Sequence, residues 1–433
     1  MRRKVKVWLL LLCLGIFMAG SFSGLSCPAL AKEKGVLDRD PIGSVSIFEI
    51  NDLTGPTSDS CVPHHNGLWD VLRDVNEKGG IIYNDPKTGK KERVKIKFRW
   101  GDNKAQAGPV PTLYDRLAHA SPKPLMCYMG SSAAAETVPR WTKRDKIVQI
   151  SGPSGQPTWY PPMWSFTVTP DYPADACTAA WWAMKDWKSK GHTEAPGWAW
   201  FTLDIPFGRA PIKPESEAYI RSLGFKIVGT WTMPFVPVDI GSQFRSMIDA
   251  GANYCYGNLV VLQEQKLMKD VTRLGLKEKI QVIACPYGIM EDIIKVAGKD
   301  AEGLAGVHYA AFPNELDKPG VKWAHDITKK YKHAWTTDGI LGCAIGRVMI
   351  MAIKRALETK GFPITGEDLY EAMLSPDGFD TGGLLPHMKF TETERRGIWK
   401  THMRGVKDGE IVRISEDFTI PDVKPGGPWT PKK

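Results

Sequence analysis

The stretch that decides the fold runs from residue 43 to residue 103 and reads GSVSIFEINDLTGPTSDSCVPHHNGLWDVLRDVNEKGGIIYNDPKTGKKERVKIKFRWGDN. Its segment 45–50 is the apolar run of a buried strand, and Gly55-Pro56 ends that strand because neither residue continues a pleated ladder. Apolar residues then recur at 68, 71, 72 and 75, which is the spacing of one helix face.

Two glycines at 79–80 end this predicted helix, and residues 93–100 alternate as a second strand. The stretch therefore predicts a β-α-β unit with a wide loop at the carboxyl end of its first strand. Open parallel sheets bind ligands at that edge. The loop lacks a G-x-G-x-x-G pattern, so a dinucleotide is not the expected ligand.

Strands and helices continue to alternate up to a long apolar helix at 338–359. Repeated βα units predict parallel sheets covered by helices on both faces. About ten strands are too many for one hydrophobic core, so we expect two lobes. The tail differs, because 388–390, 399–404 and 411–414 read as short strands with Asp408-Gly409 as a hairpin turn.

The composition is that of an ordinary globular protein. Of the 433 residues 42% are hydrophobic and 24% charged, and the formal net charge is +9. Four of these positive charges lie among the first six residues, and the rest are spread along the chain. We therefore expect no nucleic-acid partner.

The first 31 residues read as a secretory signal peptide. A basic start precedes the apolar run 7–19, and Ala29-Leu30-Ala31 fits the cleavage rule of signal peptidase. Residues 24–27 also resemble a lipoprotein cleavage box, which would attach lipid at Cys27, but Gly24 fits its first position poorly. The sequence predicts export to the periplasm, with a lipid anchor at Cys27 as the less favoured alternative.

Six cysteines remain after such a cleavage, at positions 61, 127, 177, 255, 285 and 343. An exported chain permits disulfides. The pairs Cys61–Cys127 and Cys255–Cys285 are conceivable, because their members follow or end neighbouring strands, and buried free thiols are equally compatible with the sequence.

The order of several short motifs resembles a known family. These are Leu53-Thr54-Gly55-Pro56, the segments 75–81 and 150–155, Gly130-Ser131-Ser132, Asp204-Ile205-Pro206-Phe207-Gly208, Cys285-Pro286-Tyr287-Gly288, Thr337-Asp338-Gly339 and Thr381-Gly382-Gly383. Each is weak alone, but their order over most of the mature chain is similar to that of type I periplasmic solute-binding proteins of the leucine/isoleucine/valine class, which supply ABC transporters.

The resemblance implies an α/β fold of two Rossmann-like, doubly wound lobes joined by a three-stranded hinge. Lobe 1 would comprise 41–168 and 307–384, and lobe 2 would comprise 169–306 and 385–420, with 421–433 as a frayed tail. It further implies a monomer that closes on a small ligand, an amino acid or organic acid, and then meets an ABC permease in the inner membrane. No cofactor and no chemistry are expected.

In this family a hydroxyl and amide pocket on lobe 1 takes the ligand carboxylate. Ser131, Ser132 and Ser154 are the corresponding candidates, since Ser hydroxyls donate without the desolvation cost of a buried cation. The same serines could merely cap helices. Gly155 stands where the family often has Thr, so backbone amides would replace a hydroxyl there.

Aromatic residues are the candidates on lobe 2. Phe207 matches the aromatic residue that closes over the ligand, although it could be core, and Tyr256 follows another strand toward the same cleft. Ser60 and Cys61, in the first loop, could also touch the ligand.

Tyr287 departs from the family pattern, which usually has an acid here to hold an α-ammonium group. A neutral tyrosine cannot replace that carboxylate. Either another acid such as Asp171 or Glu264 serves, or the ligand is a carboxylate without an amine and with apolar or aromatic bulk.

Two other functions are disfavoured by the sequence. The pair His64-His65 could suggest a metal, but it lacks nearby Cys or carboxylate partners and reads as polar surface. The segment 152–155 lacks the spacing of a G-x-S-x-G nucleophile elbow, so an exported enzyme is not expected. A sensor that signals to a membrane kinase through the same lobes is the alternative to transport.

Overall fold

The computed structural model describes residues 36–153, 155–234 and 239–432. The predicted signal peptide, Cys27 and Ser154 lie outside these residues. Every helix and strand named below belongs to the unit that begins at Pro41.

The first sheet forms from the N-terminal third of the chain, in the order β2-β3-β1-β4-β5-β6. Its strands are β1 (Gly43–Asn51), β2 (Ile81–Asn84), β3 (Lys91–Asp102), β4 (Pro124–Met129), β5 (Val148–Ser151) and β6 (Ser165–Thr167). All neighbours are parallel except β2, which pairs antiparallel with the start of β3. The predicted β-α-β unit is confirmed, and the short hairpin strand β2 is the element that the sequence prediction missed.

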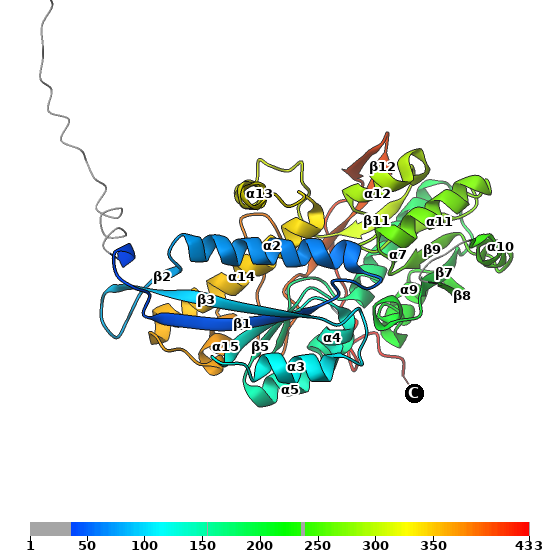
Figure 1. The fold of residues 1–433 in the computed structure, drawn as a ribbon. Helices are drawn as coiled ribbons and strands as arrows, with labels where there is room; N and C mark the ends of the chain where they lie inside the picture. The colour runs from blue at the N-terminus through cyan, green and yellow to red at the C-terminus, as the bar shows by residue number, and fades with distance from the viewer. Residues whose placement is uncertain (1–35, 154, 235–238, 433) are drawn as a thin grey trace, which may run out of the picture. The chain divides into compact units, whose positions relative to one another are not determined.

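Helices cover both faces of this sheet because its central strand is apolar on both sides. In β1, Val45 and Ile47 pack into one hydrophobic cluster, while Phe48 and Ile50 pack into another with α3 (Val110–Ala118). The first cluster also holds residues of α2 (Ser58–Glu77) and α14 (Thr337–Lys360), which lie side by side over the sheet (Figure 1).

The other helices of this lobe come from three parts of the chain. They are α2 (Ser58–Glu77), α4 (Ser132–Thr137), α5 (Pro139–Asp145), α6 (Gln156–Trp159), α13 (Pro319–Tyr331), α14 (Thr337–Lys360) and α15 (Gly366–Met373). A capping box begins α15, since the side chains of Thr365 and Asp368 each accept a hydrogen bond from the other's backbone amide.

The second sheet has the order β13-β12-β11-β10-β9-β7-β8, with β14 paired to β12. Its strands are β7 (Gly197–Leu203), β8 (Lys226–Met233), β9 (Tyr254–Gly257), β10 (Gln281–Ala284), β11 (Ala305–His308), β12 (Lys400–Lys407), β13 (Glu410–Arg413) and β14 (Phe418–Thr419). The strands from the tail run antiparallel to their neighbours, and the predicted turn Asp408-Gly409 joins β12 to β13 with positive φ at both residues.

Helices cover this sheet as well. They are α7 (Tyr172–Ser189), α8 (Pro206–Arg209), α9 (Pro214–Ser222), α10 (Gly241–Asp249), α11 (Val261–Arg273), α12 (Glu291–Ala297) and the 3₁₀ turn Gly298–Ala301. Figure 1 shows α10, α11 and α12 on one side of the sheet and α9 on the other. The predicted α/β fold with two doubly wound lobes is confirmed.

The chain passes three times between the two sheets: between β6 and α7, between β11 and α13, and just before β12. At the third passage Arg396 pairs with Thr167 in a parallel bridge. Its guanidinium is fully buried and lies 3.4 Å from the Asp171 carboxylate, 2.9 Å from that of Glu394 and 2.8 Å from that of Asp422. These ion pairs tie the first passage, the third passage and the C-terminal tail into one polar cluster at the hinge.

Contacts near the third passage bear on the predicted lobe boundaries. Phe390 packs on Phe166 and Phe379, and Arg395 stacks over Phe166 and Tyr370. These partners belong to or adjoin the first sheet, so the contacts favour a passage near residue 396 rather than at 385. The other boundaries stay a prediction.

The C-terminal tail is packed, so the expectation of a frayed 421–433 segment is wrong for its described part. Val423 is fully buried, the ring of Trp429 contacts that of Tyr219 edge-on, and Thr430 bonds to Glu215. Burying an indole and a valine compensates for the ordering of a short tail that is rich in Pro and Lys.

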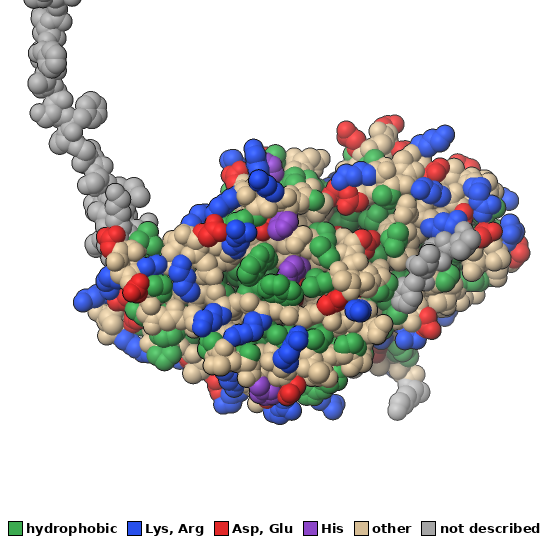
Figure 2. Space-filling view, viewed as in Figure 1, with side chains coloured by type: hydrophobic (Ala, Val, Ile, Leu, Met, Phe, Trp, Pro, Cys, Tyr) green, Lys and Arg blue, Asp and Glu red, His purple; other side chains and the backbone are tan. Residues whose placement is uncertain are grey.

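The six cysteines of the described chain are buried free thiols, so neither conceivable disulfide is formed. None of the described helices is both long and apolar enough to cross a membrane. On the face seen in Figure 2, basic and acidic side chains are interspersed rather than gathered by sign.

Candidate functional site

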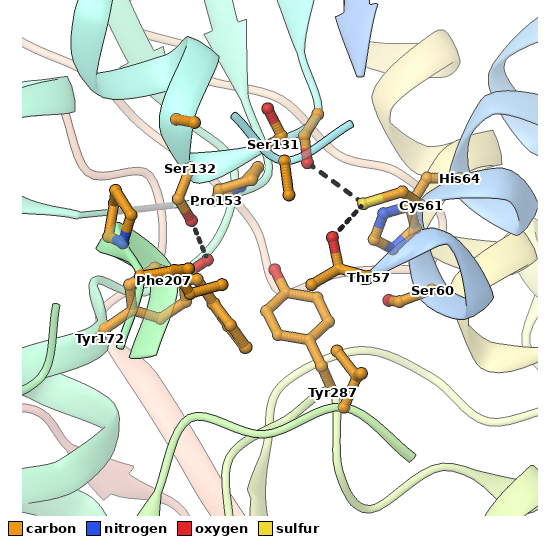
Figure 3. Close-up of a pocket in the computed structure, with 16 residues that line it drawn as sticks. Thr57, Ser60, Cys61, His64, Ser131, Ser132, Pro153, Tyr172, Phe207 and Tyr287 are labelled. Atoms are coloured by element: carbon orange, nitrogen blue, oxygen red, sulfur yellow. Dashed lines mark hydrogen bonds between the residues drawn. The ribbon is translucent and has the colours of Figure 1, made fainter. Parts of the chain in front are cut away.

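A cavity opens where the carboxyl-end loops of the two sheets meet. Figure 3 shows how its walls are divided between the lobes. From the first lobe the lining residues are Thr57, Ser60, Cys61, His64, Ala105, Gly130, Ser131, Ser132, Ala133 and Pro153, and from the second they are Tyr172, Ile205, Pro206, Phe207, Val260 and Tyr287.

Two buried or half-buried aspartates shape the loop between β1 and α2. Asp52, fully buried, accepts hydrogen bonds from the Thr57 amide at 2.8 Å, the Thr57 hydroxyl at 2.7 Å and the Gly55 amide at 2.5 Å. Asp102, at the end of β3, accepts from the Leu53 amide at 3.0 Å and from the hydroxyl of Thr54. The wide loop predicted from the sequence is thus held rigidly at the start of α2.

One face of α2 forms a wall of the cavity. Thr57 occupies the N-cap position without a side-chain capping bond, and Cys61 and His64 follow at helical spacing on the same side. The Cys61 sulfur lies 3.6 Å from the Thr57 hydroxyl and 3.7 Å from the carbonyl oxygen of Gly130. Burial raises the pKa of the Cys61 thiol well above its ordinary value, so it stays a neutral thiol and a poor nucleophile.

The turn after β4 supplies the second wall. At Gly130 a Cβ atom would lie 2.2 Å from the Asn51 side chain, so only glycine allows this close approach. The Ser131 hydroxyl donates to Asn103 at 2.9 Å and accepts from the Ala134 amide at 3.3 Å, which makes it the N-cap of α4. The Ser132 hydroxyl lies 3.2 Å from that of Tyr172 and so joins the two lobes.

Three aromatic rings form the wall on the second lobe. Tyr172, Phe207 and Tyr287 contact one another edge-on, with centroid distances of 5.5, 5.9 and 6.4 Å. In Figure 3 the ring of Tyr287 points into the cavity between Thr57 and Phe207. Burial raises the pKa of the Tyr172 and Tyr287 phenols well above their ordinary values, so both are neutral. This wall is an apolar surface with hydroxyl groups at its edge.

The structure brings together five of the eight residues predicted for the site: Ser60, Ser131, Ser132, Phe207 and Tyr287 all line the cavity. Ser154 lies outside the described residues. Gly155 does not line the cavity. It begins α6, and a Cβ atom there would lie 1.8 Å from the Glu136 carboxylate, so the glycine makes room for that side chain.

The prediction for Tyr256 is also corrected. Its side chain is fully buried, stacks on Trp198 at 5.9 Å and lies 3.4 Å from the amide oxygen of Asn258. Asn258 in turn donates to the Phe207 carbonyl at 3.0 Å. Tyr256 therefore supports the loop that carries Phe207 without itself facing the cavity.

Neither acid that the sequence offered for an ammonium group lines the cavity. Asp171 is fully buried against Arg396, and Glu264 is 1% exposed within the second lobe. Among the described residues that line the cavity there is no carboxylate, lysine or arginine. A bound α-ammonium group would have no counter-charge in this lining.

The lining residues that the sequence prediction missed include His64, Thr57 and Tyr172. His64 is 2% exposed, not polar surface, and its Nε2 lies 2.9 Å from Asp338. Within the part of the chain that the structure describes, no three potential ligands cluster as they would at a metal site. The predicted helix began only near residue 68, so these residues were left out of it. Placing its start about ten residues earlier would have put residues 57, 61 and 64 on one helix face and so indicated this wall.

The buried state of Glu264 can be tested through the pH dependence of stability. Its carboxylate has no hydrogen-bond partner among the described residues, and burial raises its pKa to about 8. Because this folded-state pKa lies above the unfolded value, the protein should lose stability as pH rises from about 4.5 to about 8. We expect Glu264→Gln to remove this loss. Relative to the wild type, the free energy of unfolding of the variant should therefore rise by on the order of 3 kcal/mol over that pH range.

Urea unfolding at pH 5, 6, 7 and 8 measures this difference. Glu278→Gln, at an exposed position of the same lobe, is the matched control and should follow the wild-type profile. Parallel pH profiles for Glu264→Gln and the wild type would contradict a buried, neutral Glu264.

Solved structures with this fold are numerous, and three illustrate it. A branched-chain amino acid ABC transporter protein from Thermus thermophilus, with bound valine, has a TM-score of 0.76 and 22% identity over 89% of this chain and 98% of its own. A fatty acid ABC transporter substrate-binding protein from Thermomonospora curvata has a TM-score of 0.73 and 16% identity, over 89% and 95%.

The third is a solute-binding protein of an ABC transporter from Rhodopseudomonas palustris BisB5 in complex with 3,4-dihydroxybenzoic acid. It has a TM-score of 0.67 and 19% identity over 88% of this chain and 99% of its own. No curated protein matches the chain significantly. The profile of the periplasmic binding protein family matches residues 45–410. With two doubly wound lobes around a cavity, and with this match over most of its length, the chain belongs to the periplasmic binding protein family.

Proposed function

We propose that this protein is the solute-binding component of an ABC importer and that it binds a small carboxylate with apolar or aromatic bulk and no α-amine. The observation that carries this proposal is the cavity lining, which combines three neutral aromatic rings with hydroxyl groups and holds no carboxylate among its described residues. An aromatic or apolar ligand gains from stacking and desolvation there, whereas an ammonium group only loses its hydration.

The similar structures support this ligand class without deciding it. One of them carries valine, and others carry 3,4-dihydroxybenzoic acid or 4-hydroxybenzoate. The fold therefore accommodates both amino acids and aromatic acids. The choice between them rests on Tyr287, a neutral residue of the cavity wall, which the sequence resemblance places where the family pattern has an acid.

Polar atoms without partners point to where a ligand carboxylate would bind. Ser60 is 5% exposed and its hydroxyl has no hydrogen-bond partner among the described residues, and the same holds for Nδ1 of His64. Both side chains line the cavity, together with the Ser132 hydroxyl. These three groups are the donors we assign to the carboxylate, because a buried polar atom without a partner is costly until a ligand supplies one.

In this proposal the ligand is bound by closure of the two lobes about the hinge at Arg396. Closure brings the aromatic wall of the second lobe onto the polar wall of the first, and the closed form is the one that an ABC permease in the membrane recognises. Neither a cofactor nor catalysis enters, as expected for a family of substrate-binding proteins. The periplasm is the compartment that this role requires, and a monomer suffices for it.

A thermal-shift panel tests the ligand class. It contains benzoate, 4-hydroxybenzoate, 3-phenylpropanoate and hexanoate, each with amino-acid counterparts such as leucine and phenylalanine. We expect one or more of the acids at 1 mM to raise the melting temperature by about 3 °C or more, because a ligand that binds only the folded state stabilises it by mass action. A rise with the amino acids and none with the acids would contradict the proposal.

A further inference from the structure

Two carboxylates reach across the mouth of the cavity in opposite directions. Asp59, in the first turn of α2, accepts a hydrogen bond from the Leu262 amide of α11 at 3.2 Å. Glu291, in the first turn of α12, accepts from the Thr337 amide of α14 at 2.7 Å and from the Thr337 hydroxyl at 2.6 Å. Each contact joins a carboxylate of one lobe to the first turn of a helix in the other.

The two amides belong to helix positions that have no partner within their own helix. The first amides of an α-helix lack an acceptor four residues back and carry the positive end of the helix dipole. Leu262 and Thr337 occupy such positions in helices of 13 and 24 residues. A carboxylate is the acceptor that best satisfies them, and here it is supplied from the opposite lobe.

These contacts lie beside the ligand cavity rather than within it. Asp59 and Glu291 line a second cavity that shares Ser60 and Tyr287 with the first. The two cavities therefore adjoin at Ser60 and Tyr287. Both carboxylates must separate from their helices before the lobes move apart.

We propose that Asp59 and Glu291 form a reciprocal latch, in which a carboxylate from each lobe caps a helix of the other and thereby holds the lobes closed over the ligand. The latch sets the affinity through the stability of the closed form, and it needs no contact with the ligand. This inference rests on the proposed function, since it requires that the lobes separate for ligand exchange.

The surroundings of the latch shift the pKa values of its two carboxylates, so that closure of the lobes depends on pH. Burial and the charge of Asp338 on α14 raise the pKa of Asp59, and hydrogen bonds from the Leu262 and Ser60 amides lower it. The net result is a pKa of about 6. Burial likewise raises the pKa of Glu291. Among the described residues, the other charged or titratable groups near this region include Cys61, Tyr287, His64 with its partner Asp338, and Asp292 with its partner Lys295.

The sign of the pH effect follows from these shifts. In the open form both carboxylates meet water and return toward their ordinary pKa values, so the closed form binds protons more tightly than the open form. Closure should therefore take up protons, and ligand affinity should rise roughly fivefold to tenfold as pH falls from 7 to 5. Asp59→Asn keeps an acceptor oxygen but cannot titrate, so it should flatten most of this dependence.

Hydrogen exchange at the Leu262 and Thr337 amides tests the latch directly. The full mature chain is measured at pH 7, alone and with any panel acid that raises its melting temperature. We expect both amides to be protected in the wild-type protein. Asp59→Ala should speed exchange at Leu262 about tenfold and Glu291→Ala should do so at Thr337, because each removes a charge-assisted hydrogen bond. Asp292→Ala, which removes a charge from the same turn as Glu291 but no contact between lobes, should leave both amides protected.

The possible outcomes test the latch and the proposed ligand class independently. Rapid exchange at both amides in the wild-type protein, or protection that survives Asp59→Ala and Glu291→Ala, would overturn the latch. Protection that depends on Asp59 and Glu291 in a protein whose melting temperature no panel acid raises would keep the latch and overturn the proposed ligand class.

Discussion

Replacing Arg396 by alanine is expected to lower the free energy of unfolding by about 3–5 kcal/mol, because it leaves a buried charge without its partner. Asp171 is fully buried and faces this guanidinium at 3.4 Å. The guanidinium also lies over the rings of Trp159 and Trp399, at 4.1 and 4.4 Å from their centroids. Alanine removes both kinds of contact at the point where the chain passes between the lobes.

Guanidinium chloride unfolding measures this loss, and two further variants interpret it. Arg396→Lys keeps the charge but loses the planar stacking and forked hydrogen bonds, so it should be intermediate. Arg413→Ala breaks an exposed pair with Asp417 in the same lobe and should cost less than about 1 kcal/mol. A loss below that level for Arg396→Ala would contradict the hinge cluster as described.

Replacing Tyr287 by alanine is expected to weaken binding of an aromatic acid at least about 30-fold, since a central buried aromatic residue contributes some 2 kcal/mol or more to binding. Its ring is 5% exposed and contacts His64, Tyr172 and Phe207. The phenol itself contributes less, because its oxygen lies 3.5 Å from that of Tyr309, at the limit of a hydrogen bond.

Calorimetric titration with the tightest acid of the panel measures this effect. Tyr287→Phe should stay within about threefold of the wild type, since it keeps the ring and loses only a weak hydrogen bond. Tyr331→Ala, on α13 and away from the cavity, is the matched control and should leave binding unchanged. Equal affinities for wild type and Tyr287→Ala would show that the ligand binds elsewhere.

Local patterns were sufficient to predict the main elements. The apolar run of β1 and the helical spacing in α2 predicted these two elements correctly, because both patterns depend on residues close in sequence. The strand β2 was missed since it is short and follows two glycines directly. The start of α2 was missed because Pro63 lies inside the helix, and a proline there normally marks its end.

The side to which a strand residue points was harder to predict. Tyr256 and Tyr287 both come from loops or strand ends in the second lobe, yet only Tyr287 faces the cavity. Both faces of a doubly covered sheet are apolar, so the alternation that would separate core from cleft is absent from the sequence. The motif order placed Phe207 and Ser132 correctly in the cavity, whereas Gly155 serves the packing of Glu136.

Contacts between lobes lay beyond sequence reasoning altogether. Nothing in the first turn of α2 distinguishes Asp59 from an ordinary acid near a helix start. Its hydrogen bond to Leu262 joins residues about 200 positions apart and depends on how the two lobes meet. The same holds for Glu291 and Thr337, so the latch could be found only in three dimensions.

The central claim is that the cavity accepts a carboxylate but offers no charge to an α-ammonium group. A calorimetric comparison of 3-phenylpropanoate with L-phenylalanine, which differ only in that group, tests it most directly. The claim predicts saturable, one-to-one binding of the acid and binding of the amino acid that is at least about 100-fold weaker, because the ammonium would be desolvated without a counter-charge. Equal or tighter binding of phenylalanine would contradict it.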